Sequence, residues 1–178
     1  MNMMFYPNPY AFPPLIASLT IASLGIFVWR KNTKSATNFS WFLVCLSMFI
    51  WLIGDTLLFS THNKQMGIFF TRIVYLGVTA VPFCGIYFSA SISKVRVKKY
   101  YVVAAMLLYM SAILIIFKSN LVIGELYNFY WGFYPKAQRY HWAYLLIWGT
   151  LFALGIILLW TKINQSSLFS QHQRCSKL

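Results

Sequence analysis

Asp55 and Arg72, two ionisable residues inside apolar runs, are the sharpest candidates for chemistry in this 178-residue sequence. Charged side chains are costly within a membrane span and usually face the helix bundle or a cavity. Asp55 lies five residues before Ser60 and Arg72 five residues after Gly67, which places each about 7 to 8 Å inside a span. The sequence therefore predicts an intramembrane ion pair. It either fixes the register of two helices or forms a polar site that faces the exterior.

The aromatic segment from Lys118 to His141 is the second candidate. Aromatic rings and cations bind apolar or aromatic ligands through stacking and cation–π contacts. The segment favours two interpretations: a cap over the helices that binds an unknown small ligand, or an interfacial segment lying on the bilayer. The candidate ligand-binding residues are Glu125, Tyr130, Trp131, Tyr134, Lys136 and His141.

Most catalytic chemistry is excluded by composition. Asp55 and Glu125 are the only carboxylates, so paired-carboxylate hydrolysis, acidic metal cages and a Ser-His-Asp relay cannot be assembled. The cysteines and histidines lack metal-ligand or redox spacing. They are Cys45, Cys84, Cys175, His62, His141 and His172. We expect no catalytic residue, no metal and no cofactor, and therefore no enzyme.

The composition predicts a membrane protein. Hydrophobic residues make up 60% of the sequence and charged residues 10%, too apolar a balance for a soluble domain of this size. We expect an all-α polytopic bundle with five spans, each about 20 residues long. The spans are about 10–29, 41–60, 67–93, 100–117 and 142–160. Residues 1–160 then form one membrane domain and residues 161–178 a short tail.

The basic residues predict the orientation of the spans. Ten Lys and Arg residues follow the first, third and fifth spans, whereas four lie in the other connections. Since cations concentrate in cytoplasmic loops, we expect an N-terminus outside, a cytoplasmic C-terminus and a place in the bacterial inner membrane. The segment before the first span has no Lys or Arg, so that span is expected to be retained. The cations therefore indicate a bilayer partner and no nucleic acid.

Two further features concern helix packing. Pro82 lies midway along the third span, where a proline is expected to kink the helix and provide a pivot. Gly149 and Ala153 share one face of the fifth span. Small residues at this spacing favour close approach of a neighbouring helix.

Three sequence blocks carry a family resemblance. They are residues 41–54, residues 70–78 followed by Pro82, and residues 131–137 leading to His141. In this order, the sequence resembles the N-terminal seven-helix membrane region of bacterial sensor histidine kinases. The resemblance implies a sensor input module that passes an exterior or intramembrane signal to a cytoplasmic output domain in two-component signal transduction.

The sequence departs from this family in having five predicted spans. The polar stretch 167–174 lies about where the basic loop before a sixth helix is expected. The resemblance therefore implies either a truncated sensor or a stand-alone subunit, with a homodimer or a partner signalling protein as candidate assemblies. Two other functions stay open: a structural or interaction subunit of the membrane, and a transporter or channel subunit.

Overall fold

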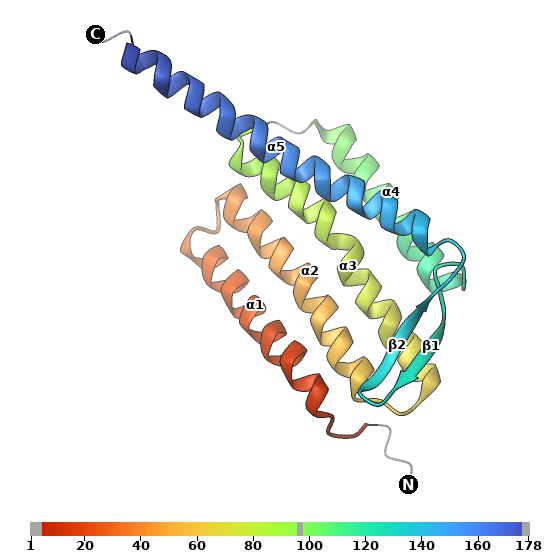
Figure 1. Ribbon diagram of the computed structural model, residues 1–178. Helices are drawn as coiled ribbons and strands as arrows, with labels where there is room; N and C mark the ends of the chain where they lie inside the picture. Colours follow the sequence, from red (N-terminus) through yellow and green to blue (C-terminus); the bar gives the residue numbers. More distant parts are fainter. Residues whose placement is uncertain (1–4, 96–97, 176–178) are drawn as a thin grey trace.

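The computed structural model describes residues 5–95 and 98–175, with 162–175 as backbone only. The first three long helices follow a short 3-10 turn and lie side by side in chain order (Figure 1). The elements are η1 Pro9–Ala11, α1 Phe12–Lys31, α2 Ala36–Phe59, α3 Lys64–Ile92, α4 Lys99–Lys118, β1 Ile123–Phe129, β2 Gly132–Ala137 and α5 His141–Cys175.

Five helices in the described part are long and apolar enough to cross a membrane, which confirms the predicted helical bundle. Side chains at the connections set where two of them begin. The Ser35 hydroxyl accepts the Asn38 N–H at the start of α2, and the Asn63 side chain accepts two N–H groups at the start of α3. Both are N-caps that satisfy orphan donors of the first turn.

Helix α3 is the centre of the bundle. It packs against α2 and α5 and also contacts α4 and the strands. Two glycines bring α2 and α3 close: a Cβ on Gly54 would lie 2.8 Å from the Val74 side chain, and a Cβ on Gly77 would lie 2.7 Å from the Ser47 carbonyl oxygen. Small residues at such crossings permit the dense packing on which membrane helices depend.

The β-hairpin formed by β1 and β2 was not predicted. The two strands are antiparallel, with Tyr127 opposite Tyr134 and Phe129 opposite Gly132. A hairpin alone is marginally stable, and this one packs against α2 and α3 at one end of the bundle. We call this the hairpin end, where α2 ends and α3 begins. The opposite end, where α1 ends and α2 begins, is called the basic end.

Helix α5 continues past the predicted end of the fifth span. It runs from His141 to Cys175 as one helix, so the region expected as a separate short tail, residues 161–178, continues this helix as far as Cys175, while the candidate span itself ends at Thr161. It extends beyond the other helices at the basic end (Figure 1). Cys175, His172 and Arg174 lie on this extension, and their side chains are outside the described residues.

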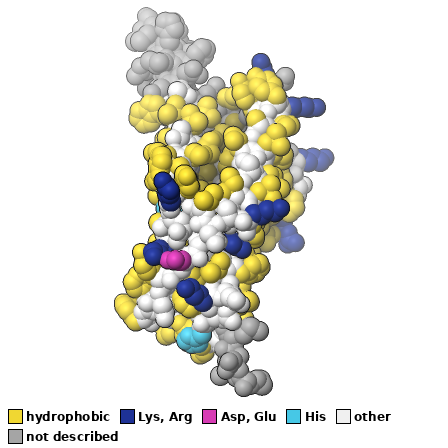
Figure 2. Space-filling model, turned by 90° about the vertical axis from the view of Figure 1, so that its right-hand side faces the viewer, with side chains coloured by type: hydrophobic (Ala, Val, Ile, Leu, Met, Phe, Trp, Pro, Cys, Tyr) yellow, Lys and Arg dark blue, Asp and Glu magenta, His cyan; other side chains and the backbone are white. Residues whose placement is uncertain are grey.

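The outer surface suits a bilayer. Helices α4 and α5 leave most of their apolar side chains exposed. On the face shown in Figure 2, hydrophobic side chains form a broad surface and the Lys and Arg side chains lie in separate small groups. The buried hydrophobic cluster lies at the hairpin end, where α3, the end of α4 and the start of β1 meet; its members are Val74, Tyr75, Ile116, Val122 and Ile123.

Candidate functional site: the hairpin end

Asn8 ties three separate segments together at the hairpin end. Its side chain is 5% exposed, and its Nδ2 donates to the Phe59 carbonyl at 2.6 Å and the Trp131 carbonyl at 2.9 Å. Its Oδ1 accepts the Tyr10 N–H at 3.0 Å and so caps η1. Because buried polar groups must be paired, this amide fixes the N-terminal segment, the end of α2 and the hairpin turn to one another.

The turn of the hairpin is built from Tyr130 and Trp131. Gly132 follows with φ of 132°, and a Cβ there would lie 3.2 Å from the Phe59 Cα. A glycine is therefore required by both backbone conformation and space. The Trp131 ring meets Phe59 edge-on at 5.4 Å and stacks on Phe129 at 5.0 Å. These contacts seat the turn on the end of α2.

The outward face of the hairpin carries one ion pair. Glu125 lies opposite Lys136 in the register, and Lys136 Nζ is 2.7 Å from Glu125 Oε2. The hydrogen bond from Lys136 and its positive charge hold the pKa of the Glu125 carboxyl below its usual range. The same hydrogen bond and charge raise the pKa of Lys136. The pair is solvent-exposed and neutral as a unit.

A polar cluster lies beneath the hairpin, between α3 and α5. The Tyr75 hydroxyl is 3.4 Å from His141 Nδ1, and the Thr79 hydroxyl is 3.3 Å from the Tyr144 hydroxyl. The Tyr75 and Tyr144 rings also contact each other, with centroids 5.4 Å apart. The cluster therefore joins the first two turns of α5 to the part of α3 between Tyr75 and Thr79.

Pro82 leaves a free carbonyl that α5 uses. Proline has no N–H, so the Val78 carbonyl, four residues earlier, lacks its usual intrahelical donor. The Trp148 indole N–H donates to that oxygen at 2.9 Å. Pro82 is buried within α3, and the expected kink there stays a prediction. The observed effect of Pro82 is this polar link between α3 and α5.

The structure corrects the predicted pairing of Asp55 with Arg72. Among the described residues the salt bridge joins Glu125 to Lys136, and none joins Asp55 to Arg72. Val74 faces α2 at Gly54, and Arg72, two residues earlier, lies about 160° around the helix from it. Arg72 therefore points away from α2, and its buried Nε has no hydrogen-bond partner.

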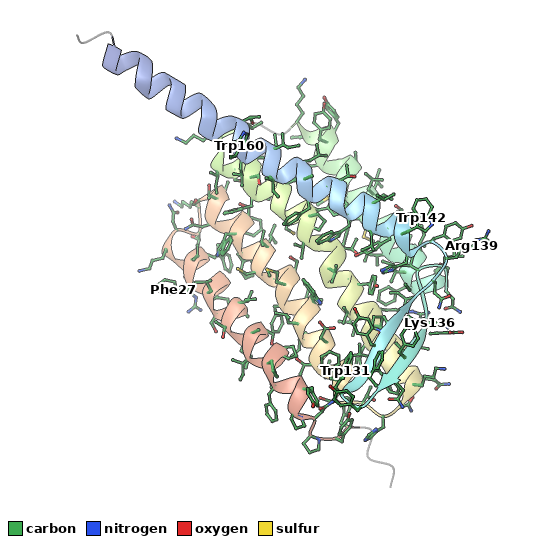
Figure 3. All side chains as sticks on the ribbon, in the orientation of Figure 1. Phe27, Trp131, Lys136, Arg139, Trp142 and Trp160 are labelled. Carbon is green, nitrogen blue, oxygen red and sulfur yellow. The ribbon has the colours of Figure 1, made fainter. Side chains whose placement is uncertain are left out.

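The six predicted ligand-binding residues do not converge on one point. Trp131 is packed into the turn, whereas Tyr130 beside it is 87% exposed. Glu125 and Lys136 pair with each other, and His141 lies beneath the hairpin against Tyr75. Figure 3 shows Trp131 and Lys136 on the hairpin, and Arg139 and Trp142 beside it at the start of α5.

The sequence matches the family described as the N-terminal 7TM region of histidine kinase over residues 13–176. The chain belongs to this family. No curated protein matches the sequence. As a histidine kinase N-terminal 7TM region, the chain is a multi-pass membrane module of the sensor type rather than a catalytic domain.

Within this histidine kinase 7TM region, sequence reasoning missed four residues that link separate elements through hydrogen bonds. Asn8 precedes Pro9, a pattern typical of a helix N-cap, but its long-range partners leave no local signal. Tyr75, Tyr144 and Trp148 lie in apolar runs where aromatic residues are ordinary. Pro82 could have indicated one of these contacts from the sequence, because a mid-helix proline requires another donor for the carbonyl four residues earlier.

Helix α5 also corrects a packing prediction for this 7TM region. In the described part of the chain no atom lies within 4 Å of a Cβ built on Gly149, and Ala153 is exposed, so the predicted close approach of a neighbouring helix on this face is not seen there. A Cβ on Gly155 would instead lie 3.6 Å from Ile86 and Ser89 of α3. Tyr144, Trp148 and Gly155 share the face that meets α3, because they recur at helical spacing.

Proposed function

We propose that this chain is the input module of a membrane signalling system in which the hairpin end receives the stimulus and α3 with α5 transmits it. Membership of the histidine kinase sensor family supports the general role. The hydrogen-bonded contact between Tyr75 and His141 carries the finer proposal. It links the receiving end to a helix that continues without a break to Cys175.

The stimulus at the hairpin end is an apolar or aromatic ligand. Tyr127, Tyr130 and Tyr134 are exposed on the hairpin, and Lys136 lies over the Tyr127 ring at 5.8 Å. Flat rings next to a cation suit stacking and cation–π contact. Because Glu125 pairs with Lys136, this pair adds no net charge to the ring surface.

Transmission requires two arrangements of α3 and α5 that bind the ligand unequally. In the described part, three polar links join these helices: Tyr75 to His141, Thr79 to Tyr144, and Val78 to Trp148. Each is a single hydrogen-bonded contact. Pro82 serves as the pivot in this proposal, since the helix backbone there is held by the Trp148 indole rather than by its own amide.

The proposed orientation puts the hairpin end outside the cytoplasmic membrane. In the described part, Arg30, Lys31, Lys34, Lys94, Lys98 and Lys99 lie at the basic end, and Lys64, Lys118, Lys136 and Arg139 at the hairpin end. The excess of cations favours a cytoplasmic basic end. The extension of α5 then projects into the cytoplasm, where a second copy or a partner signalling protein would contact it.

The experiment joins residues 1–175 to the catalytic core of a histidine kinase through a continuous helix and measures autophosphorylation in lipid vesicles. Trp131→Ala removes the contacts that seat the turn on α2, so we expect the rate to change about fivefold or more in either direction. Tyr101→Phe, at the basic end of α4, is the matched aromatic control and should leave the rate unchanged. Equal rates in both variants would instead favour a structural membrane subunit.

A further inference from the structure

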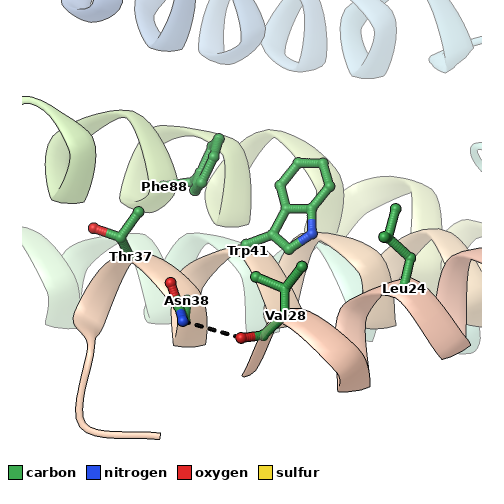
Figure 4. A pocket seen from close by; sticks show the side chains of 6 residues that line it. All are labelled: Leu24, Val28, Thr37, Asn38, Trp41 and Phe88. Atoms are coloured by element: carbon green, nitrogen blue, oxygen red, sulfur yellow. Dashed lines mark hydrogen bonds between the residues drawn. The ribbon is translucent and has the colours of Figure 1, made fainter. Parts of the chain in front are cut away.

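An apolar groove lies at the basic end, far from the hairpin end and its proposed role. It has a volume of about 340 Å³, within the range of small-ligand pockets. Its walls come from three helices, as Figure 4 shows. The lining residues are Leu24 and Val28 of α1, Thr37, Asn38 and Trp41 of α2, and Phe88 of α3.

The groove exists because α1 and α3 lie on either side of α2. The Asn38 side chain donates to the Val28 carbonyl at 3.0 Å and holds α1 against α2. On the other side, Trp41 packs against Phe88 with ring centroids 5.2 Å apart. The floor and both walls are thus fixed by named contacts, so the groove is a preformed feature of the bundle.

Two lysines lie near the groove at the basic end. On α1, Lys31 recurs with Leu24 and Val28 at helical spacing, and its Nζ lies over the exposed ring of Phe27, 4.9 Å from the ring centroid. Lys34 lies in the connection just before Ser35, the N-cap of α2. Both lysines are exposed. The N-terminus of α2 adds the positive end of a helix dipole at the same place.

No acidic side chain of this chain lies near these lysines. The sequence has two, Asp55 and Glu125. Glu125 is on the hairpin, and Asp55 lies about 27 Å along α2 from Thr37 at 1.5 Å per residue. These lysines are therefore available to an external anion. Basic sites between membrane helices at the bilayer surface bind anionic lipid headgroups.

We propose that the groove binds one anionic phospholipid, with an acyl chain against Trp41 and Phe88 and the phosphate at Lys31 and Lys34. The distance of the groove from the two lysines fits such a lipid. Leu24 lies seven residues from Lys31, about 10 Å along α1, so the groove occupies the acyl layer directly beneath the headgroup. The indole of Trp41 suits that boundary between apolar and wet surroundings.

Native mass spectrometry of the full chain tests this, using detergent micelles doped with an equimolar mixture of phosphatidylglycerol and phosphatidylcholine of the same acyl chains. We expect the chain to retain phosphatidylglycerol preferentially. Replacing Lys31 and Lys34 with Gln should lower this retention about tenfold or more. The matched control, Lys64→Gln with Lys118→Gln, removes the same charge at the hairpin end and should retain the lipid as the wild type does.

A second variant tests the apolar part of the site without changing charge. Val28→Trp fills the groove and should also reduce phosphatidylglycerol retention, whereas Ile26→Trp, on the exposed far side of α1, should not. If the lysine variant fails to fold, the Val28→Trp comparison decides alone. The proposal would be overturned if the chain retained phosphatidylcholine as well as phosphatidylglycerol, or if the two control variants lost as much phosphatidylglycerol as the variants of the groove. Displacement of the lipid by inorganic phosphate would also overturn it.

Discussion

The Asn8 side chain is the polar group on which the hairpin end most depends. It is the shared partner of Phe59, Trp131 and Tyr10, which lie on three different segments. Asp55 and Arg72, by contrast, were recognisable in the sequence but do not pair in the structure. A charge within an apolar run is visible in a sequence, whereas its direction around the helix depends on which face the neighbouring helix covers.

Asn8→Ala should lower the free energy of unfolding by about 1 to 3 kcal/mol, because it leaves the partly buried carbonyls of Phe59 and Trp131 without this donor. Thermal unfolding of the purified chain in detergent measures this. Asn128→Ala removes an exposed amide from the hairpin and is the control. If Asn8→Ala lost no more free energy of unfolding than Asn128→Ala, the Asn8 amide would not hold the three segments together.

The Glu125 carboxyl should titrate below the ordinary range for a glutamate. Because its folded pKa is lowered, the ion pair stabilises the hairpin above the ordinary Glu pKa, and this contribution is lost as the pH falls through the folded value. A carbon-13 NMR titration of the labelled carboxyl measures the pKa directly. In Lys136→Gln the value should return to the ordinary range; an unchanged low value would mean that another group is the cause.

At the scale of elements, the spans were predictable and the hairpin was not. Apolar length and basic loops mark each long helix, and these signals hold whatever the neighbours are. The strands Ile123–Phe129 and Gly132–Ala137 are short and rich in aromatic residues, which is equally typical of an interfacial segment. Their pairing depends on packing against α2 and α3, and this long-range contact is absent from any local pattern.

Trp148 and Pro82 should be energetically coupled. Trp148→Phe removes the donor to the Val78 carbonyl and should cost about 0.6 to 1.7 kcal/mol, as interhelical hydrogen bonds in membranes do. In a Pro82→Ala background the cost should fall, because an alanine N–H can donate to the same carbonyl. Unfolding of the four chains of this double-mutant cycle measures the coupling. If Trp148→Phe were equally destabilising with Pro82 and with Pro82→Ala, the proposed link would be refuted.

Gly77 and Gly85 provide a matched test of the α2–α3 contact. Both lie in α3, but a Cβ on Gly77 would meet Ser47 and Trp51, whereas a Cβ on Gly85 would meet no atom within 4 Å. Gly77→Ala should therefore destabilise the chain by about 1 to 3 kcal/mol through overpacking. Gly85→Ala should be neutral or slightly stabilising, since alanine favours helix. Similar effects in chemical unfolding would contradict the close crossing.

At the scale of the whole molecule, the two ends of the bundle differ in chemistry. The hairpin end holds both carboxylates, the polar cluster and the Asn8 contacts, while the basic end holds the larger share of the cations and the lipid groove. The sequence predicted this division through its loops. It did not predict that α5 would run from the hairpin end through the bundle and beyond it, which gives the molecule a continuous element between its two ends.

The most direct test of transmission is the autophosphorylation rate of the kinase fusion carrying Tyr75→Phe. This change removes one hydroxyl, the group that contacts His141, and leaves the apolar ring in place. We predict a change in rate of about fivefold or more, with a loss of stability no greater than the roughly 0.6 to 1.7 kcal/mol of one interhelical hydrogen bond and with unchanged expression. A rate equal to that of the unmodified fusion and of the Tyr101→Phe control would contradict the proposed coupling between the hairpin end and α5.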